Sequence, residues 1–111
     1  MESDWRITVD VTNTNYKIIK EVITDDLGWD YINEDSEEEF DIFWSDLPIS
    51  NQKFLDLESY QKTNHFPGMA QICRKNLLAK NLNAMQKLFP DDYNFYPKTW
   101  ILPHEIENFR L

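Results

Sequence analysis

Two adjacent basic residues, Arg74 and Lys75, are the side chains in this sequence best suited to bind a ligand. They lie in the segment Met69–Phe89, where apolar residues recur at helical spacing and predict one continuous amphipathic helix. On a wheel of 100° per residue, Arg74 falls inside the apolar stripe and Lys75 at its edge. Arg74 also lies in the second predicted turn, close enough to the helix N-terminus for its free N–H groups to add their own attraction for an anion.

An arginine on an apolar helix face requires a partner, because an unpaired buried guanidinium is energetically costly. Either Arg74 forms a structural ion pair with one of the many acids in the first half of the chain, or it binds the phosphate or carboxylate of a ligand. Lys75 could reach the same space. Asn81 is a second polar residue on this face, and we expect it to hydrogen-bond to a neighbouring loop.

The other potentially reactive residues do not form a recognisable catalytic set. His65 is expected to be a packed loop residue holding a hydrogen bond, and His104 has no Cys or carboxylate at zinc-ligand spacing. Cys73 falls on the apolar side of the predicted helix, which favours a buried thiol over a nucleophile. The only glycines are Gly28 and Gly68, so there is no Gly-rich phosphate loop. The sequence therefore predicts no complete active site and no metal site.

The composition fits one domain that spans residues 1–111. The chain is 41% hydrophobic and 28% charged and contains four Trp, five Tyr and seven Phe, a content typical of a packed core. It has one Cys, no signal peptide at its start and no apolar run long enough for a membrane span, so we expect a reducing cytosolic or cytoskeletal compartment and no membrane.

The charge is divided unequally along the chain. The formal net charge of -9 argues against nucleic-acid binding, which requires a cationic surface. Residues 1–60 contain 4 basic and 16 acidic residues, whereas residues 61–111 contain 7 basic and 4 acidic residues. The second half is therefore the part that could accept an anionic partner, and the acidic run 34–39 is expected to be a solvated loop.

The order of predicted elements indicates a small α/β fold. Alternation predicts a strand at Arg6–Val11, and helical spacing follows through Leu27, with Asn13 or Thr14 as N-cap and Gly28 as C-cap. The remaining expected elements are a strand at Trp29–Tyr31, a strand at Phe40–Trp44 with one apolar face, a short helix after Pro48 capped by Ser50, an ordered loop at Tyr60–Gly68, the helix Met69–Phe89 ended by Pro90, a strand within Phe95–Pro103 and a final short helix. The prolines at both ends favour either an edge position for that strand or a strand limited to Thr99–Leu102.

The second half also carries a specific family resemblance. The string YQKTNHFPGMAQICRK at Tyr60–Lys75 continues as NLLAKNLNAMQKLFPDDYNFYPKTWILP. It closely resembles the amino-terminal part of the tubulin tyrosine ligase-like family, and specifically its glutamylase branch. The upstream Phe40–Asp46, FDIFWSD, looks like the Trp-containing strand that precedes this string in the family.

The resemblance implies a fold, a reaction and partners. Such enzymes use ATP to activate a carboxylate as an acyl phosphate, which a glutamate amine attacks, and so extend side chains on the acidic tails of tubulin. The implied fold is a small amino-terminal mixed sheet with flanking helices, followed by two ATP-grasp portions that hold ATP, magnesium and most catalytic residues. Lys75 looks like the lysine that reaches toward nucleotide phosphates, and Arg74 like a residue near the acceptor peptide.

On this resemblance, residues 1–111 are expected to be a monomeric fragment that lacks the ATP-grasp portions and is inactive alone. Its expected partner is the tubulin tail, and its location the cytoplasm and microtubule cytoskeleton, including cilia and basal bodies. Two alternatives remain: a non-catalytic tubulin-binding module or truncated pseudo-ligase, and a chain that folds poorly because the surface meant for missing domains is apolar and exposed.

Overall fold

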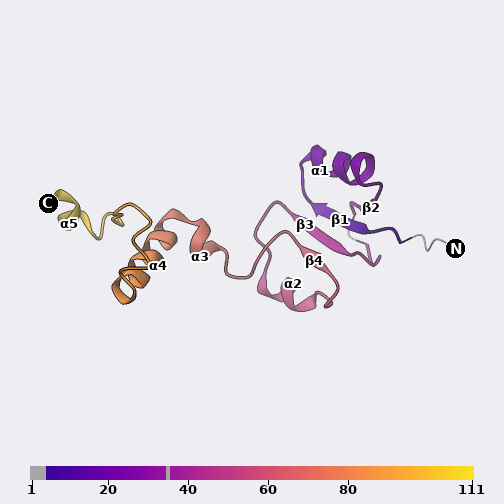
Figure 1. Ribbon diagram of the computed structural model, residues 1–111. Coiled ribbons are helices and arrows are strands. Elements are labelled where there is room, and N and C mark those ends of the chain that lie inside the picture. Colours follow the sequence, from indigo (N-terminus) through magenta and orange to yellow (C-terminus); the bar gives the residue numbers. More distant parts are fainter. Residues whose placement is uncertain (1–4, 35) are drawn as a thin grey trace. The chain divides into compact units, whose positions relative to one another are not determined.

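The chain forms two compact units, which we call the sheet unit (Met1–Pro67) and the helical unit (Gly68–Leu111). The computed structural model describes residues 5–34 and 36–111 (Figure 1). Among these described residues, no helix is long and apolar enough to cross a membrane.

The sheet unit is built on four parallel strands in the order β2-β1-β3-β4. They are β1 (Thr8–Asn13), β2 (Asp30–Ile32), β3 (Ile42–Ser45) and β4 (Lys62–Thr63). The predicted α/β sheet with flanking helices is confirmed, and all three strand pairings are parallel. The loop prediction missed β4, because two residues are too short to show alternation. Its pairing begins where Lys62 N donates to Asp41 O at 2.9 Å.

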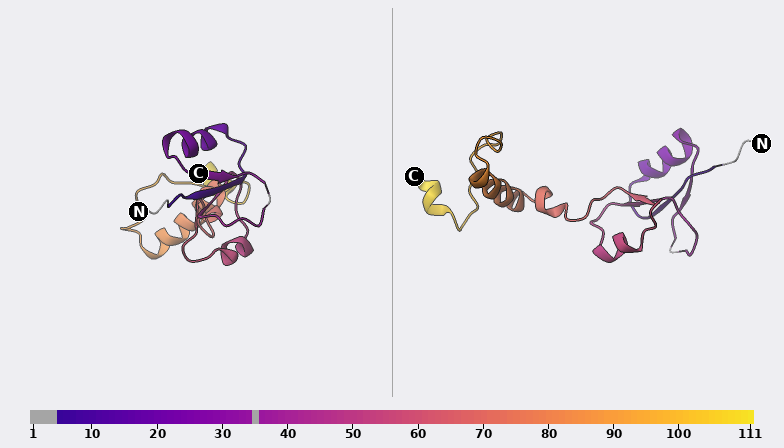
Figure 2. Two further views of the ribbon diagram at one scale, coloured as in Figure 1. Left: turned by 90° about the vertical axis from the view of Figure 1, so that its right-hand side faces the viewer. Right: turned by 60° about the horizontal axis from the view of Figure 1, so that its bottom comes forward.

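Helices lie on both faces of the sheet, as Figure 2 shows. One face carries α1 (Lys17–Glu21), which continues into the π-helical turn η1 (Val22–Asp26), and the other carries α2 (Asn51–Asp56). Val9, Val11 and Ile23 form the buried core under α1, with Ile42 and Trp44 packed against it. The prediction that the strand at Phe40–Trp44 has one apolar face was incomplete, because Phe43 is buried on the opposite face of β3.

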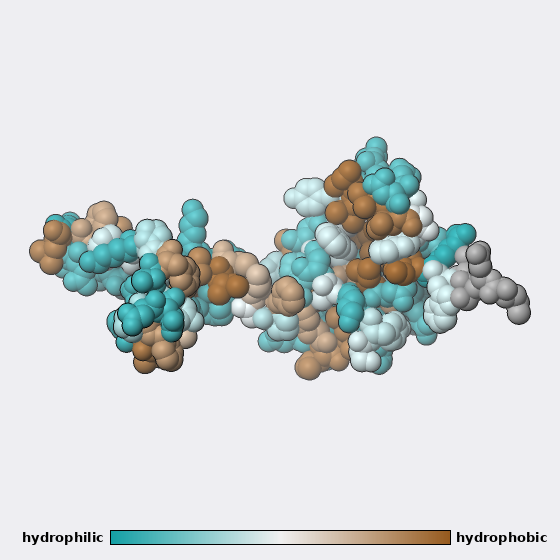
Figure 3. Space-filling view, viewed as in Figure 1, coloured by the Kyte–Doolittle hydropathy of each residue, from teal (hydrophilic) through white to brown (hydrophobic). Residues whose placement is uncertain are grey.

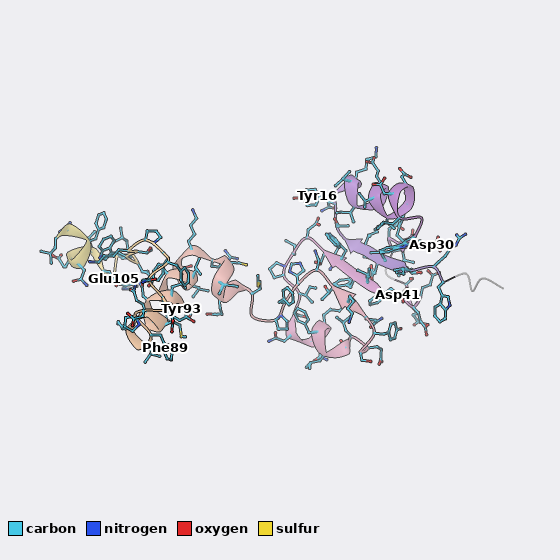
Figure 4. The ribbon with its side chains drawn as sticks, viewed as in Figure 1. Tyr16, Asp30, Asp41, Phe89, Tyr93 and Glu105 are labelled. Atoms are coloured by element: carbon cyan, nitrogen blue, oxygen red, sulfur yellow. The ribbon has the colours of Figure 1, made fainter. Side chains whose placement is uncertain are left out.

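Two carboxylates lie at the start of β1, and one of them completes its backbone hydrogen bonding. Asp41 Oδ2 accepts the N–H of Thr8 at 2.8 Å, and Arg6 lies 3.8 Å from the carboxylate of Asp30. Asp41 and Asp30 belong to the two segments that flank β1 (Figure 4). Asp41 therefore fixes the start of β1, whereas Asp30 makes an exposed ion pair. The acids of residues 34–39 are exposed and lie in a solvated loop, as predicted, wherever the structure describes them.

The ends of the first helix differ in part from the sequence prediction. Its N-cap is Tyr16, and not Asn13 or Thr14, because Thr14 Oγ1 instead accepts the N–H of Tyr16 at 3.2 Å and delays the helix start. Gly28 follows the last helical turn with φ +65°, a conformation that favours glycine, so the predicted stop is confirmed.

Ser50 caps α2 as predicted, and this cap provides a test of the local structure. Its hydroxyl accepts the N–H of Lys53 at 3.2 Å. We expect Ser50→Ala to lower the free energy of unfolding of the sheet unit by about 1 kcal/mol, because one helical N–H loses its acceptor. Urea unfolding followed by Trp fluorescence measures this change. Ser50→Asp, which can restore the cap, is the matched control, and equal stability of all three proteins would contradict the expected result.

The helical unit contains three helices and little core. They are α3 (Ala70–Cys73), α4 (Lys75–Leu88) and α5 (Ile106–Arg110). Ala79 is the single buried side chain among the described residues of this unit. Large apolar side chains are exposed on both units, and Figure 3 shows several at the surface; those of the helical unit are Met69, Ile72, Leu88, Phe89, Phe95, Leu102, Phe109 and Leu111.

Two sequence predictions for the helical unit were wrong. The helix Met69–Phe89 is interrupted at Arg74, whose φ of -87° and ψ of 126° are extended. The strand predicted at Thr99–Leu102 does not form, because its backbone groups bond to side chains: Asn83 Nδ2 donates to Thr99 O at 3.1 Å, and Ile101 N donates to Glu105 Oε2 at 2.6 Å. The final short helix is confirmed as α5.

Candidate anion-binding site

Arg74 and Lys75 lie at the junction of α3 and α4, and both are exposed. The prediction that Arg74 occupies an apolar helix face was wrong, because the chain is extended at Arg74 and the helical phase is lost there. Within residues 5–34 and 36–111, the Arg74 guanidinium has no ion pair or hydrogen bond, so the structural ion pair considered for it is not found. The guanidinium is instead open to solvent.

The junction places these two cations at the start of a long helix. Arg74 is the N-cap of the 14-residue helix α4, and its side chain makes no capping hydrogen bond. The first bond of the helix runs from Leu78 N to Arg74 O at 2.8 Å, so the N–H groups of the first turn have no acceptor within α4. Exposed N–H groups, the helix dipole and two cationic side chains favour a phosphate or carboxylate at this position.

The charge of α4 adds to this preference for anions. The helix contains Lys75, Lys80 and Lys87 and no acidic residue. In the described part of the helical unit, the one ion pair joins Arg110 to Glu107 at 3.6 Å, and none of the α4 lysines has an acidic partner within 4.0 Å. The potential along α4 is therefore positive and not neutralised by acids of the unit itself.

Two neighbouring polar residues differ in how well the sequence predicted them. Cys73 is exposed, so the predicted buried thiol was wrong; α3 is a single turn that ends at Cys73 and gives this face no cover. Asn81 was predicted to hydrogen-bond to a neighbouring loop, and its Nδ2 donates instead to the backbone of a helix, at Gln71 O, over 2.9 Å. The partner is α3 itself, so Asn81 joins α3 to α4 across the break at Arg74.

The NHFPGM string has a structural role at its start that the sequence did not reveal. Asn64 Oδ1 accepts the N–H of Ser45 at 3.0 Å, and Asn64 Nδ2 donates to Ser45 O at 2.9 Å. His65 Nε2 also donates to Ser45 O at 2.8 Å, because a carbonyl can only accept, so the predicted hydrogen bond of His65 is confirmed. Gly68, with φ +71°, begins the next unit.

The residues around the junction do not enclose a nucleotide. Neither Arg74 nor Lys75 lines any of the five main cavities of the described chain. No group of three or more His, Cys, Asp or Glu within residues 5–34 and 36–111 is placed to hold a metal ion. The junction is therefore a solvent-exposed candidate site for one anionic group.

Comparison with known proteins identifies relatives over most of the chain. Residues 53–111 match the profile described as the tubulin-tyrosine ligase family. A protein named tubulin polyglutamylase TTLL13 from Mus musculus is 41% identical over 104 residues, which cover 94% of this chain and 13% of the relative. Tubulin polyglutamylase TTLL7 from Mus musculus is 42% identical over 104 residues (94% and 11%), and tubulin polyglutamylase ttll6 from Danio rerio is 49% identical over 73 residues (66% and 9%). The chain thus spans a small fraction of these relatives.

Proposed function

Because the chain belongs to the tubulin-tyrosine ligase family, we propose that it is the amino-terminal part of an ATP-dependent tubulin polyglutamylase, which forms an amide between glutamate and an acidic tubulin tail. The observation that carries this proposal is the similarity to proteins named tubulin polyglutamylase across 94% of the chain. The unpaired cations of the α3–α4 junction agree with it, since the acceptor carboxylates and the nucleotide phosphates of such a reaction are both anionic.

The two junction residues receive different roles in this proposal. Arg74 contacts the carboxylates of the acceptor peptide, to which its planar guanidinium can donate two parallel hydrogen bonds. Lys75 contributes one ammonium group to the phosphates of ATP. The described residues provide no further enclosure for ATP or magnesium, and we expect residues 1–111 to be inactive alone. For the longer enzyme, we propose that ATP is the phosphoryl donor and that tubulin is the partner. We propose that this enzyme acts on cytoplasmic and ciliary microtubules.

Glutamate incorporation into tubulin tests the proposal. Residues 1–111 with ATP are expected to incorporate none. A chimera of the Mus musculus TTLL13 polyglutamylase, in which this chain replaces the matching 104 residues, is expected to retain the activity of its parent. Incorporation by the 111-residue chain itself would contradict the expected inactivity, and a folded but inactive chimera would contradict the assignment to this enzyme.

Arg74→Glu in the chimera tests the role of the junction. We expect kcat/KM for tubulin to fall about tenfold or more, because one attractive charge becomes repulsive next to an acidic peptide. Lys80→Glu makes the same change of charge elsewhere on the same helix and is the matched control. A loss no greater than that of the control would contradict the role of Arg74.

A non-catalytic binding module is the second candidate, and the unpaired cations of α4 are the observation that favours it. It predicts that residues 1–111 capture tubulin in a pull-down that weakens with salt and is lost in Arg74→Glu. Tubulin capture combined with an inactive chimera would favour this candidate. Absence of capture at low salt would exclude it.

A further inference from the structure

The helical unit contains a second cationic feature, which is a groove away from the α3–α4 junction. A cavity of about 740 Å³ lies between the C-terminal half of α4, residues 98–100 and α5. The turn after α4, in which Tyr93 N donates to Phe89 O at 3.1 Å, reverses the chain (Figure 4). Residues 98–100 therefore return to the end of α4, and the groove has walls from three segments.

Two lysines supply the cationic side chains of the groove. Lys87 and Lys98 line it, both are exposed, and neither has an acidic partner within 4.0 Å among the described residues. The Lys98 ammonium lies 5.1 Å from the centroid of the Trp100 ring, and Lys98 is exposed. The one acidic side chain of the lining, Glu105, accepts the N–H of Ile101 through Oε2 at 2.6 Å and keeps its negative charge.

The base of the groove is held in place by neighbouring contacts. The rings of Trp100 and Phe109 meet edge to face, with centroids 5.5 Å apart and an interplanar angle of 76°. Asn83 is fixed on both sides, because its Nδ2 donates to Thr99 O and its Oδ1 accepts from the Tyr96 hydroxyl at 2.7 Å. The aromatic surface is therefore positioned before any ligand arrives, and this lowers the ordering cost of binding.

We infer that this groove binds a segment of acidic peptide, with two of its carboxylates on Lys87 and Lys98 and its methylene groups against Trp100. A volume of about 740 Å³ exceeds the space that one phosphate or carboxylate fills, and the aromatic base offers apolar contact that a simple anion does not use. The inference rests on the proposed function and deepens it: the acceptor tail contacts a second site near the end of α4, in addition to Arg74.

Peptide titration tests the groove. The 111-residue chain is titrated at low salt into a fluorescently labelled polyglutamate peptide, and anisotropy gives the dissociation constant. We expect saturable binding that polyglutamine of equal length does not show. The double variant Lys87→Glu/Lys98→Glu is expected to weaken binding at least about tenfold, because two attractive contacts become repulsive.

Control variants separate the groove from general charge effects. Lys80→Glu lies on the same helix outside the groove lining, and we expect it to weaken binding less than about threefold. Lys87→Gln/Lys98→Gln, with helicity checked by circular dichroism, serves if the charge reversal unfolds the unit, and it should also weaken binding more than Lys80→Gln.

Several results would contradict the proposal that this groove binds an acidic peptide. They are equal loss in Lys80→Glu, unchanged affinity in both double variants, equal binding of polyglutamine, and no saturable binding by the unmodified chain. If Arg74→Glu loses peptide affinity and both double variants keep it, the peptide binds at the α3–α4 junction and not in the groove. None of these results decides the ligase assignment, because that depends on glutamate incorporation by the chimera.

Discussion

Phe43→Ala is expected to lower the free energy of unfolding of the sheet unit by about 3–5 kcal/mol. The Phe43 side chain is 5% exposed on the α2 face of β3, and its ring centroid lies 6.2 Å from that of Phe40. The Lys53 ammonium lies 4.3 Å from the Phe43 ring centroid, so the substitution removes a cation–π contact as well as apolar contact. Since small domains are stable by about 5–15 kcal/mol, a large part of the total would be lost.

Urea unfolding followed by Trp fluorescence measures this loss. Leu55→Ala is the matched control on α2, because Leu55 is 78% exposed and its truncation should change stability by less than about 0.5 kcal/mol. If Phe43→Ala and Leu55→Ala unfold at the same urea concentration, Phe43 does not contribute to the core as the structure indicates.

Asn64→Ala is expected to cost about 2–3 kcal/mol, because it removes two hydrogen bonds to one residue of β3. Ser45 is 2% exposed, and the Asn64 amide binds both its N–H and its carbonyl oxygen. The carbonyl keeps its bond from His65, whereas the Ser45 N–H loses its acceptor. The change should therefore appear most clearly at this single amide.

Amide hydrogen exchange measured by NMR reports on Ser45 directly. We expect its protection to fall in Asn64→Ala by more than that of Val9, which lies elsewhere in the sheet, and the unit to unfold at a lower urea concentration. Asn33→Ala, at an exposed position, is the control and should leave both quantities unchanged. Undiminished protection of the Ser45 amide would contradict the role of Asn64 as its hydrogen-bond acceptor.

Local patterns in the sequence were sufficient for the elements that pack against each other. Alternation located β1 and β3, since Val9, Val11 and Ile42 contact a helix through one face. Local patterns were insufficient to predict β4, because its two residues are placed by pairing with β3 and not by their own composition. The same holds for residues 99–102, where side chains of Asn83 and Glu105 take the backbone groups that a strand would use.

The helix break shows the corresponding limit for the candidate site. The sequence identified Arg74 and Lys75 from charge type and family resemblance, and the structure places both at the start of α4. It could not identify the interruption, because no Pro or Gly marks it and the apolar period continues from Ile72 to Leu88. The sequence did not predict the pairing of Lys87 with Lys98 for a different reason: they are 11 positions apart, and only the turn after α4 brings them to one groove.

The sparse burial of side chains in the helical unit has a thermodynamic consequence for ligand binding. A unit whose described part buries only Ala79 gains little from its own interior, so its folded fraction is sensitive to occupancy. The apparent affinity for a ligand is then the intrinsic affinity multiplied by the folded fraction of the unit. Ligand binding and folding of the unit therefore favour each other. Saturating ligand should raise the melting temperature of this half while that of the sheet stays constant.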